Sequence, residues 1–264
     1  MSLPDRSPFD LGGHVALITG GNSGIGLGMA KGLAAHGADV VIWGTNPDKN
    51  DAAIDALGAY DGELLSIVCD VSDEPAVAQA MADSIDEMGR IDSVFVNAGV
   101  SSQAPSFLDM TADEWRRVMA VNLDGAFYTC REATKHMVAR FEDGDERGGS
   151  LVVTTSGSAY FGQQSGQNYG ASKAGVIALM RGIAVQHARH RIRANAILPG
   201  WIESDMTAGA LSWDRFVERN LPRVPMRRWG RPDDFAGIAV YLASSASSYQ
   251  TGDVVTIDGG YHSF

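Results

Sequence analysis

Residues 14–26 read HVALITGGNSGIG, and this stretch decides the fold class. Its first six residues form a short apolar run typical of a buried β-strand, and the glycines after them predict a tight turn into a helix that begins near Gly24. Such a helix would point free backbone N–H groups at a bound diphosphate. The glycine spacing is TGxxxGxG rather than GxGxxG, so the prediction of a nucleotide site depends on the position of the loop directly after the first strand.

Apolar runs and helical stretches alternate along the rest of the chain. The expected strands cover residues 14–19, 38–44, 63–70, 93–99, 150–156, 192–198 and 253–258. The expected helices cover residues 24–37, 52–60, 74–89, 113–140 and 169–190. Near-continuous apolar strands separated by helices predict an α/β fold, a Rossmann-type doubly wound parallel sheet of about seven strands. No linker divides the chain, so residues 1–264 are expected to form a single NAD(P)-binding domain.

The composition argues against several classes of function. A net charge of −11 disfavours nucleic-acid binding, because an acidic surface repels the phosphate backbone. No apolar run approaches the roughly 20 residues that span a bilayer, and the first residues do not resemble a signal peptide, so no membrane partner is expected. Two distant cysteines, Cys69 and Cys130, favour a reducing compartment, and we expect a cytoplasmic protein. None of the six histidines has a metal-ligand spacing, so no metal site is expected.

The end of the second expected strand bears on the choice of cofactor. An acidic residue there would hold the adenosine ribose 2′-hydroxyl, but the strand ends Trp43-Gly44-Thr45-Asn46. Thr45 and Asn46 could donate hydrogen bonds to a 2′-phosphate, and Lys49 is close in sequence, although no arginine is. This pattern favours NADP over NAD and leaves both open.

Two connecting segments differ in character. Residues 202–229 mix aromatic residues with prolines after the sixth strand, where an open α/β sheet binds its ligand, and are a candidate substrate lid. A packed surface helix is the alternative. Residues 141–149 read FEDGDERGG and are expected to form a solvated connector.

Residues 169–174 read YGASKA and place Tyr169 four positions before Lys173, on one helix face. A tyrosine with its ordinary pKa of about 10 is a poor base at neutral pH. A neighbouring ammonium, helped by a positively charged nicotinamide, would lower that pKa and allow proton exchange with an alcohol or carbonyl oxygen. The alternative is an ordinary contact on a helix surface.

The sequence resembles the short-chain dehydrogenase/reductase family from about His14 to Tyr261. The motifs that carry the resemblance occur in the family's order: TGGNSGIG, Asp70-Val71, Asn97-Ala98-Gly99, Asn122, Ser156, Tyr169-x3-Lys173, Pro199-Gly200 and the terminal IDGGY. Members of this family include acyl-carrier-protein reductases and sugar dehydrogenases.

The resemblance implies a role for each matching residue. Tyr169 would be the catalytic acid/base, Lys173 would lower its pKa and bind the nicotinamide ribose, and Ser156 rather than Ser158 would hold the substrate oxygen. Asn122 would support a water that leads to the lysine. The expected cofactor contacts are Gly20, Asn22, Ser23, Gly24, Ile25, Gly26, Thr45, Asn46, Asp70, Val71, Asn97, Ala98, Gly99, Tyr169, Lys173, Pro199, Gly200, Ile202 and Ser204.

These expectations combine into an NAD(P)-dependent oxidoreductase that transfers hydride between nicotinamide and an alcohol or carbonyl substrate. The alternatives are a catalytically silent cofactor-binding regulator, or an epimerase or dehydratase on the same fold. The substrate stays open between a sugar acid or polyol and an acyl or cyclic ketone. Small residues on the Tyr169 helix, together with the resemblance, predict a homodimer at least and favour a homotetramer.

Overall fold

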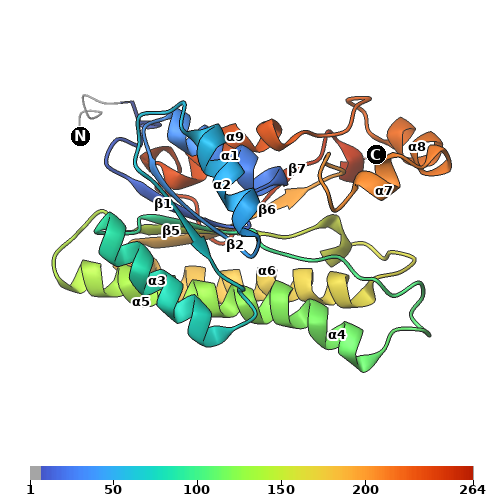
Figure 1. The fold of residues 1–264 in the computed structure, drawn as a ribbon, viewed down its shortest axis with the longest axis horizontal. Coiled ribbons are helices and arrows are strands. Elements are labelled where there is room, and N and C mark those ends of the chain that lie inside the picture. The colour runs from blue at the N-terminus through green and yellow to red at the C-terminus, as the bar shows by residue number, and fades with distance from the viewer. Residues whose placement is uncertain (1–6, 264) are drawn as a thin grey trace.

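A single parallel sheet forms the centre of the computed structural model, which describes residues 7–263 (Figure 1). Its seven strands lie in the order β3-β2-β1-β4-β5-β6-β7. They are β1 (Val15–Thr19), β2 (Asp39–Gly44), β3 (Leu64–Val68), β4 (Ser93–Val96), β5 (Gly149–Thr154), β6 (Ile192–Pro199) and β7 (Val254–Ile257). The order reverses between β1 and β4, and such a switch point is where open α/β sheets bind ligands. The predicted doubly wound fold is confirmed.

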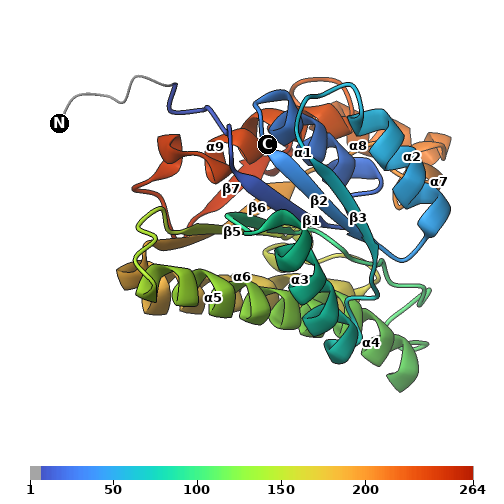
Figure 2. The ribbon, with the colours of Figure 1, turned by 60° about the vertical axis from the view of Figure 1, so that its left-hand side comes forward.

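Helices cover both faces of the sheet (Figure 2). One layer contains α1 (Gly24–Ala35), α2 (Pro47–Leu57) and α9 (Ala236–Ala243). The other contains α3 (Glu74–Met88), α4 (Ala112–Met119), α5 (Gly125–Glu142) and α6 (Gln167–His187). No helix among residues 7–263 is long and apolar enough to cross a membrane.

Successive side chains along each strand point to opposite faces of the sheet, and a hydrophobic core lies on each face. Leu17 and Trp43 pack with α3, α5 and α6, whereas their neighbours Ile18 and Ile42 pack with α1, α2 and α9. All four side chains are fully buried. A sheet covered by helices on both faces therefore accounts for strands that are apolar at most positions.

The C-terminal region packs unusually close to α1. A Cβ atom added to Gly28 would lie 2.1 Å from the carbonyl oxygen of Pro232, and one added to Gly32 would lie 2.6 Å from the Cα atom of Ala236. Pro232 begins a short 3₁₀ turn that leads into α9. Sequence analysis did not predict α9, because the run AGIAVYLA is apolar on every side and carries no helical period.

The single helix expected over residues 113–140 is interrupted. A π-helical turn, Ala120–Asp124, separates α4 from α5. Asn122 lies in this turn and is fully buried. π-Turns inside helices occur frequently at functional sites, and this one sets the position of a residue that the sequence had singled out.

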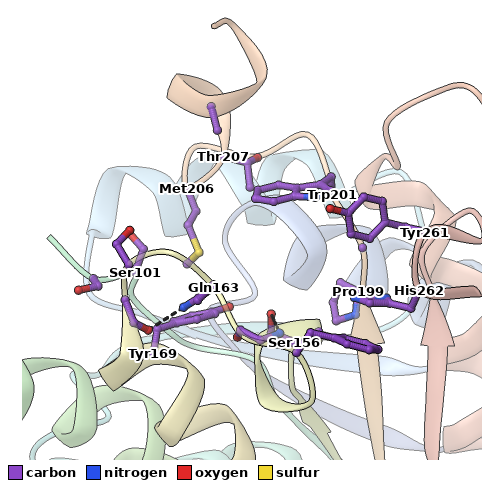
Figure 3. Close-up of a pocket in the computed structure, with 18 of the residues that line it drawn as sticks. Ser101, Ser156, Gln163, Tyr169, Pro199, Trp201, Met206, Thr207, Tyr261 and His262 are labelled. Atoms are coloured by element: carbon purple, nitrogen blue, oxygen red, sulfur yellow. Dashed lines mark hydrogen bonds between the residues drawn. The ribbon is translucent and has the colours of Figure 1, made fainter. Parts of the chain in front are cut away.

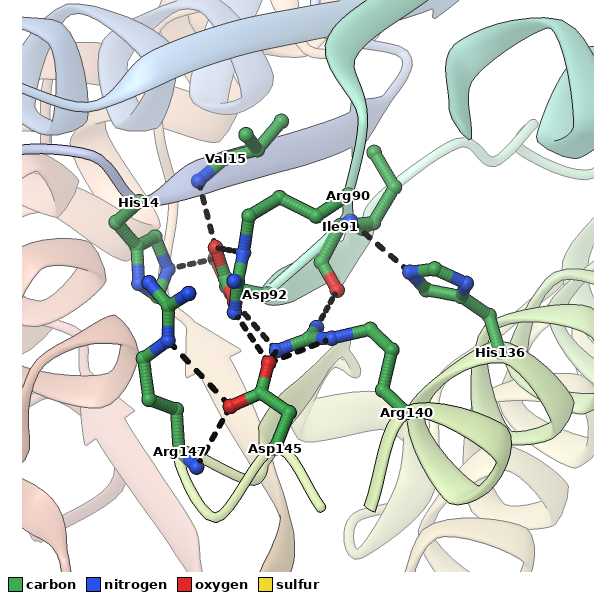
Figure 4. Close-up of polar contacts among 10 residues, drawn as sticks. His14, Val15, Arg90, Ile91, Asp92, His136, Arg140, Asp145 and Arg147 are labelled. Carbon is green, nitrogen blue, oxygen red and sulfur yellow. Dashed lines mark hydrogen bonds and ion pairs between the residues drawn. The ribbon is translucent and has the colours of Figure 1, made fainter. Parts of the chain in front are cut away.

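An ionic network joins the amino ends of the central strands (Figure 4). Asp92, just before β4, accepts hydrogen bonds from Arg90 and from Arg140 on α5. Asp145 accepts from the same two arginines, at 3.0 and 2.6 Å. Burial lowers the pKa of the neighbouring His14 to about 4. The expectation that residues 141–149 form a solvated connector is therefore wrong at Asp145, which is only 23% exposed and accepts hydrogen bonds from Arg140 and from the distant Arg90.

Candidate active site

The glycine loop after β1 makes a tight turn into α1. Gly20 has a positive φ of 63°, and a Cβ atom on Gly26 would lie 2.1 Å from the Gly20 carbonyl oxygen. Ser23 precedes α1 and makes no side-chain cap, so the first N–H groups of the helix keep their capacity to donate. The loop therefore offers backbone donors at a positive helix end, the chemistry that binds a diphosphate.

A cavity of about 600 Å³ opens above this loop. The predicted cofactor residues that line it are Gly20, Asn22, Ser23, Gly24, Ile25, Thr45, Asn46, Asp70, Val71, Asn97, Ala98, Gly99, Tyr169, Lys173, Pro199, Gly200, Ile202 and Ser204. Gly26 does not line the cavity, because its place is beneath the turn against Gly20. Gly99 has no side chain to fill the cavity beside Lys173: a Cβ atom added there would lie 3.4 Å from the Lys173 Nζ atom. The cavity thus fits a dinucleotide.

The part of this cavity at the carboxyl end of β2 is where the sequence predicts the adenosine ribose. Thr45 and Asn46 are exposed there, and the Asn46 side chain caps α2 by accepting from the Lys49 N–H group at 3.0 Å. The Lys49 ammonium forms an exposed ion pair with Asp205, at 2.6 Å. Lys49 is therefore not a free phosphate ligand, and Asp205 is a cavity residue that sequence analysis missed.

Three of the predicted catalytic residues, Ser156, Tyr169 and Lys173, line this cavity, and Figure 3 shows Ser156 and Tyr169 close together. Ser156 follows β5, and Tyr169 lies in the first turn of α6. The Nζ atom of Lys173, one turn further along α6, is 5.8 Å from the centre of the Tyr169 ring. It donates to the Thr154 carbonyl oxygen at 2.8 Å. The structure therefore brings phenol, ammonium and hydroxyl together at the carboxyl end of β5.

The pKa values of this group differ from expectation in one respect. Burial raises the pKa of Tyr169, and a hydrogen bond with Ser156 offsets only part of that effect. Burial also lowers the pKa of Lys173 to about 8. The sequence predicted that Lys173 lowers the pKa of Tyr169, whereas in the protein without cofactor the loss of water around the phenol raises it. At neutral pH Tyr169 is a proton donor.

Asn122 acts on the loop after β4 through its side chain. Its Oδ1 atom accepts from the Val100 N–H group at 2.8 Å, and its Nδ2 atom donates to the Val100 carbonyl oxygen at 3.0 Å. Nδ2 also lies 3.2 Å from the Ser172 Oγ atom on α6. Asn122 therefore holds Gly99 and Val100 next to Lys173, and it does not line the cavity itself.

Thr19 supports the site and was missed in the sequence. Its hydroxyl accepts hydrogen bonds from the N–H groups of Asn97 and Ala98, at 3.0 and 3.1 Å, and so ties the end of β4 to the end of β1. The only sign of this role in the sequence was that a residue with a hydroxyl group, Thr19, stands at the last position of the first strand. Its partners, 78 and 79 residues away, could not be read from the sequence.

A second cavity, of about 490 Å³, adjoins the first. The two share Ser156, Tyr169, Pro199, Gly200, Met206 and Thr207. Sequence analysis missed Met206 and Thr207 as cofactor-cavity residues. Because Ser156 and Tyr169 stand where the cavities meet, a substrate in the smaller one would contact both hydroxyls.

Met206 and Thr207, of the segment predicted to be a lid, line both cavities. This segment carries α7 (Ala208–Leu211) and α8 (Asp214–Asn220). Ile202 is only 4% exposed and is bridged to Gly230, so the first residue of the predicted segment belongs to the core and the two ends are pinned together. Trp201 packs edge-on against Phe216, with 4.7 Å between ring centres.

Known proteins are similar to this chain over nearly its whole length. A family model described as Enoyl-(Acyl carrier protein) reductase matches residues 20–262. The chain is similar to 3-oxoacyl-[acyl-carrier-protein] reductase FabG of Chlamydia pneumoniae, with 36% identity over 94% of this chain and 96% of that protein. It is also similar to gluconate 5-dehydrogenase of Gluconobacter oxydans (strain 621H), with 34% identity over 98% of both.

A solved structure agrees with these matches. A protein from Beutenbergia cavernae with NADP bound at low occupancy superposes with a TM-score of 0.90 at 32% identity, covering 98% of this chain and 100% of that one. The chain therefore belongs to the short-chain dehydrogenase/reductase family.

Proposed function

We propose that this protein is an NAD(P)-dependent oxidoreductase that interconverts an alcohol and a carbonyl compound, with Tyr169 as the acid/base. One observation carries the proposal: Ser156 and Tyr169 lie where the two cavities meet, with Lys173 directly behind them. The similarity to two named oxidoreductases over almost the full chain supports it.

Each residue has a task in this reaction. A bound nicotinamide supplies or accepts the hydride. During carbonyl reduction, Ser156 and Tyr169 donate hydrogen bonds to the oxygen on which negative charge grows, and the Tyr169 phenol then gives up its proton. Lys173 places a positive charge near the resulting phenolate, while Asn122 keeps the adjoining loop in place and, in our proposal, supports a water that leads to the lysine.

We propose NADP as the preferred cofactor. No carboxylate follows Trp43 at the end of β2, and Thr45 and Asn46 leave room for a 2′-phosphate. The Lys49–Asp205 pair weakens this preference because it neutralises the nearest ammonium. A related structure with NADP bound supports the choice.

We further propose that the protein is at least a homodimer and in its full assembly a homotetramer. Exposed residues of α6 form a stripe of small side chains with Val185, which is 85% exposed, at one end. On the adjacent α5, Phe127 is 42% exposed. Two neighbouring helices with exposed apolar and small residues suit close packing against a second copy of the chain.

Replacement of Tyr169 by Phe tests the proposed chemistry. The variant keeps the ring but loses the proton, so kcat for ketone reduction should fall by roughly 10²- to 10⁴-fold. Cofactor affinity, measured by fluorescence titration, should change less than threefold or so, because the variant leaves the glycine loop intact. Turnover is followed by cofactor absorbance over a panel of ketones, sugars and polyols.

Tyr160→Phe is the matched control, since Tyr160 is exposed and lines neither cavity. It should turn over substrate at the wild-type rate. Undiminished activity in Tyr169→Phe would end the tyrosine mechanism. Tight cofactor binding by the wild type without turnover of any compound would favour a silent regulator instead, and product isomerisation or water loss without net redox change would favour an epimerase or dehydratase.

A further inference from the structure

The substrate cavity has a charge opposite to that of the whole protein. The chain carries 32 acidic and 21 basic residues, yet no Asp or Glu lines this cavity. Arg223 contributes a permanent positive charge to its wall, and the other titratable side chains that line it are His262, Tyr261 and the proposed acid/base Tyr169. Arg223 is exposed at the mouth of this cavity, and a cavity wall that carries a cation and no carboxylate favours an anionic ligand.

Arg223 is held toward the cavity by an aromatic residue. Its guanidinium carbon lies 4.6 Å from the centre of the Tyr261 ring, and its Nη1 atom donates to the Tyr261 hydroxyl at 3.0 Å. That hydroxyl in turn donates to the Asn220 Oδ1 atom at 3.2 Å. Stacking on a ring fixes the plane of a guanidinium and leaves its other N–H groups free to donate.

Arg223 also lacks an acidic partner within residues 7–263. Nearby Arg228, in contrast, is neutralised by Asp234 through two hydrogen bonds. An oriented guanidinium without a carboxylate partner at a cavity wall is the geometry that recognises a carboxylate of a ligand.

Asp258 is the acidic residue behind this wall, and it is sequestered. Its side chain is 8% exposed and accepts from the N–H groups of Gly260 and His262, both at 2.8 Å. It also accepts from the Nδ1 atom of His262, at 2.7 Å. The imidazole ring stacks on Phe161, with 5.0 Å between ring centres, and presents its own edge to the cavity in place of the carboxylate.

We propose that the substrate is a small polyhydroxylated keto acid or the corresponding hydroxy acid, with its carboxylate bound by Arg223 and its reacting oxygen at Ser156 and Tyr169. This inference rests on the proposed function. Hydroxyl and amide side chains of Ser101, Ser102 and Gln163 line the same cavity and suit a substrate with several hydroxyl groups. A volume of about 490 Å³ accommodates a molecule of this size.

Two ketoses test the role of the carboxylate directly. 5-Keto-D-gluconate and L-sorbose share a carbon skeleton, hydroxyl configuration and ketone, and they differ in a terminal carboxylate against a hydroxymethyl group. The wild-type enzyme should reduce the acid with a kcat/KM at least tenfold higher than the neutral sugar. Arg223→Gln should raise KM for the acid by about 10- to 100-fold, with a smaller change in kcat, and leave kcat/KM for L-sorbose within about twofold.

Arg219→Gln removes the same charge from the neighbouring exposed surface of α8 and is the matched control, because Arg219 does not line the cavity. It should leave both substrates unaffected. Arg223→Lys should restore part of the affinity for the acid, since it keeps the charge but not the planar fork.

The failures of the two proposals are distinguishable. Reduction of L-sorbose or a neutral cyclic ketone, with no preference for the acid, overturns the carboxylate inference and upholds the oxidoreductase. Equal losses in Arg223→Gln and Arg219→Gln also overturn it. Absence of redox turnover with every acid and every neutral ketone of the panel overturns both.

Discussion

Tyr169 and Lys173 carry opposite perturbations at the residue scale. The phenol is harder to ionise than a free tyrosine, while the pKa of the ammonium falls to about 8. Carbonyl reduction requires both groups in their protonated forms. The protein alone is therefore prepared for reduction at neutral pH, and alcohol oxidation must first remove a proton from a buried phenol.

The pH dependence of the two directions should consequently differ. Reduction should stay near its maximum from about pH 6 to 7 and fall as pH rises through the Lys173 pKa of about 8, because the lysine then loses its charge. Oxidation should increase with pH as the Tyr169 phenolate becomes accessible. Initial rates in both directions at saturating cofactor check this, with cofactor affinity measured at each pH. A reduction rate that climbs between pH 7 and 9 contradicts the assignment.

At the scale of single elements, the proposed preference for NADP over NAD depends on the residues at the end of β2. Thr45→Asp should place a carboxylate where a 2′-phosphate would bind, repelling it and accepting a hydrogen bond from a free ribose hydroxyl. The ratio of kcat/KM for NADP to that for NAD should fall by tenfold or more. Thr45→Ser is the control and should keep the wild-type ratio.

A second substitution in this region should change the cofactor preference in the opposite direction, toward NADP. Asp205→Asn should free Lys49 from its ion pair and raise the preference for NADP several-fold, although an exposed pair contributes little by itself. If neither Asp205→Asn nor Thr45→Asp alters the ratio, the ribose pocket lies elsewhere.

Elements with a clear pattern of apolar residues, or with glycines that mark a turn, could be predicted from the sequence. Elements without such a signal could not. Strands and the glycine loop were found because buried parallel strands are apolar throughout and a turn of this kind requires glycine. The helix α9 was missed because the run AGIAVYLA is apolar throughout and shows no helical period, and the π-turn at Asn122 was missed because a one-residue insertion leaves the helical period on either side intact. Site residues were identified by motif order, whereas the raised Tyr169 pKa depends on burial that no local sequence expresses.

For the whole molecule, the property to test is the number of copies of the chain in the proposed assembly. Ala178 is exposed within the small-residue stripe of α6, so Ala178→Arg should prevent close approach of a second copy and shift the mass measured by light scattering to a smaller multiple of 28.0 kDa. Ala56→Arg, at an exposed position of α2, is the matched control and should leave the mass unchanged. A monomeric wild-type protein would contradict the proposed assembly.

Ion pairs between residues far apart in the chain could not be predicted from the sequence. Arg140 reaches Asp92 across 48 residues, and Arg90 reaches Asp145 across 55. Nothing in the acidic, glycine-rich composition of residues 141–149 distinguishes an anchored carboxylate from a solvated one.

The Arg90–Asp92–Arg140–Asp145 network lies away from the residues assigned to catalysis and substrate recognition. It fastens the amino ends of the strands, whereas every group assigned to catalysis or recognition sits at their opposite, carboxyl ends or in the segment after Ile202. Substitutions that adapt the cavities to a new substrate can therefore leave this ionic network, and the packing of the strands that it joins, unchanged.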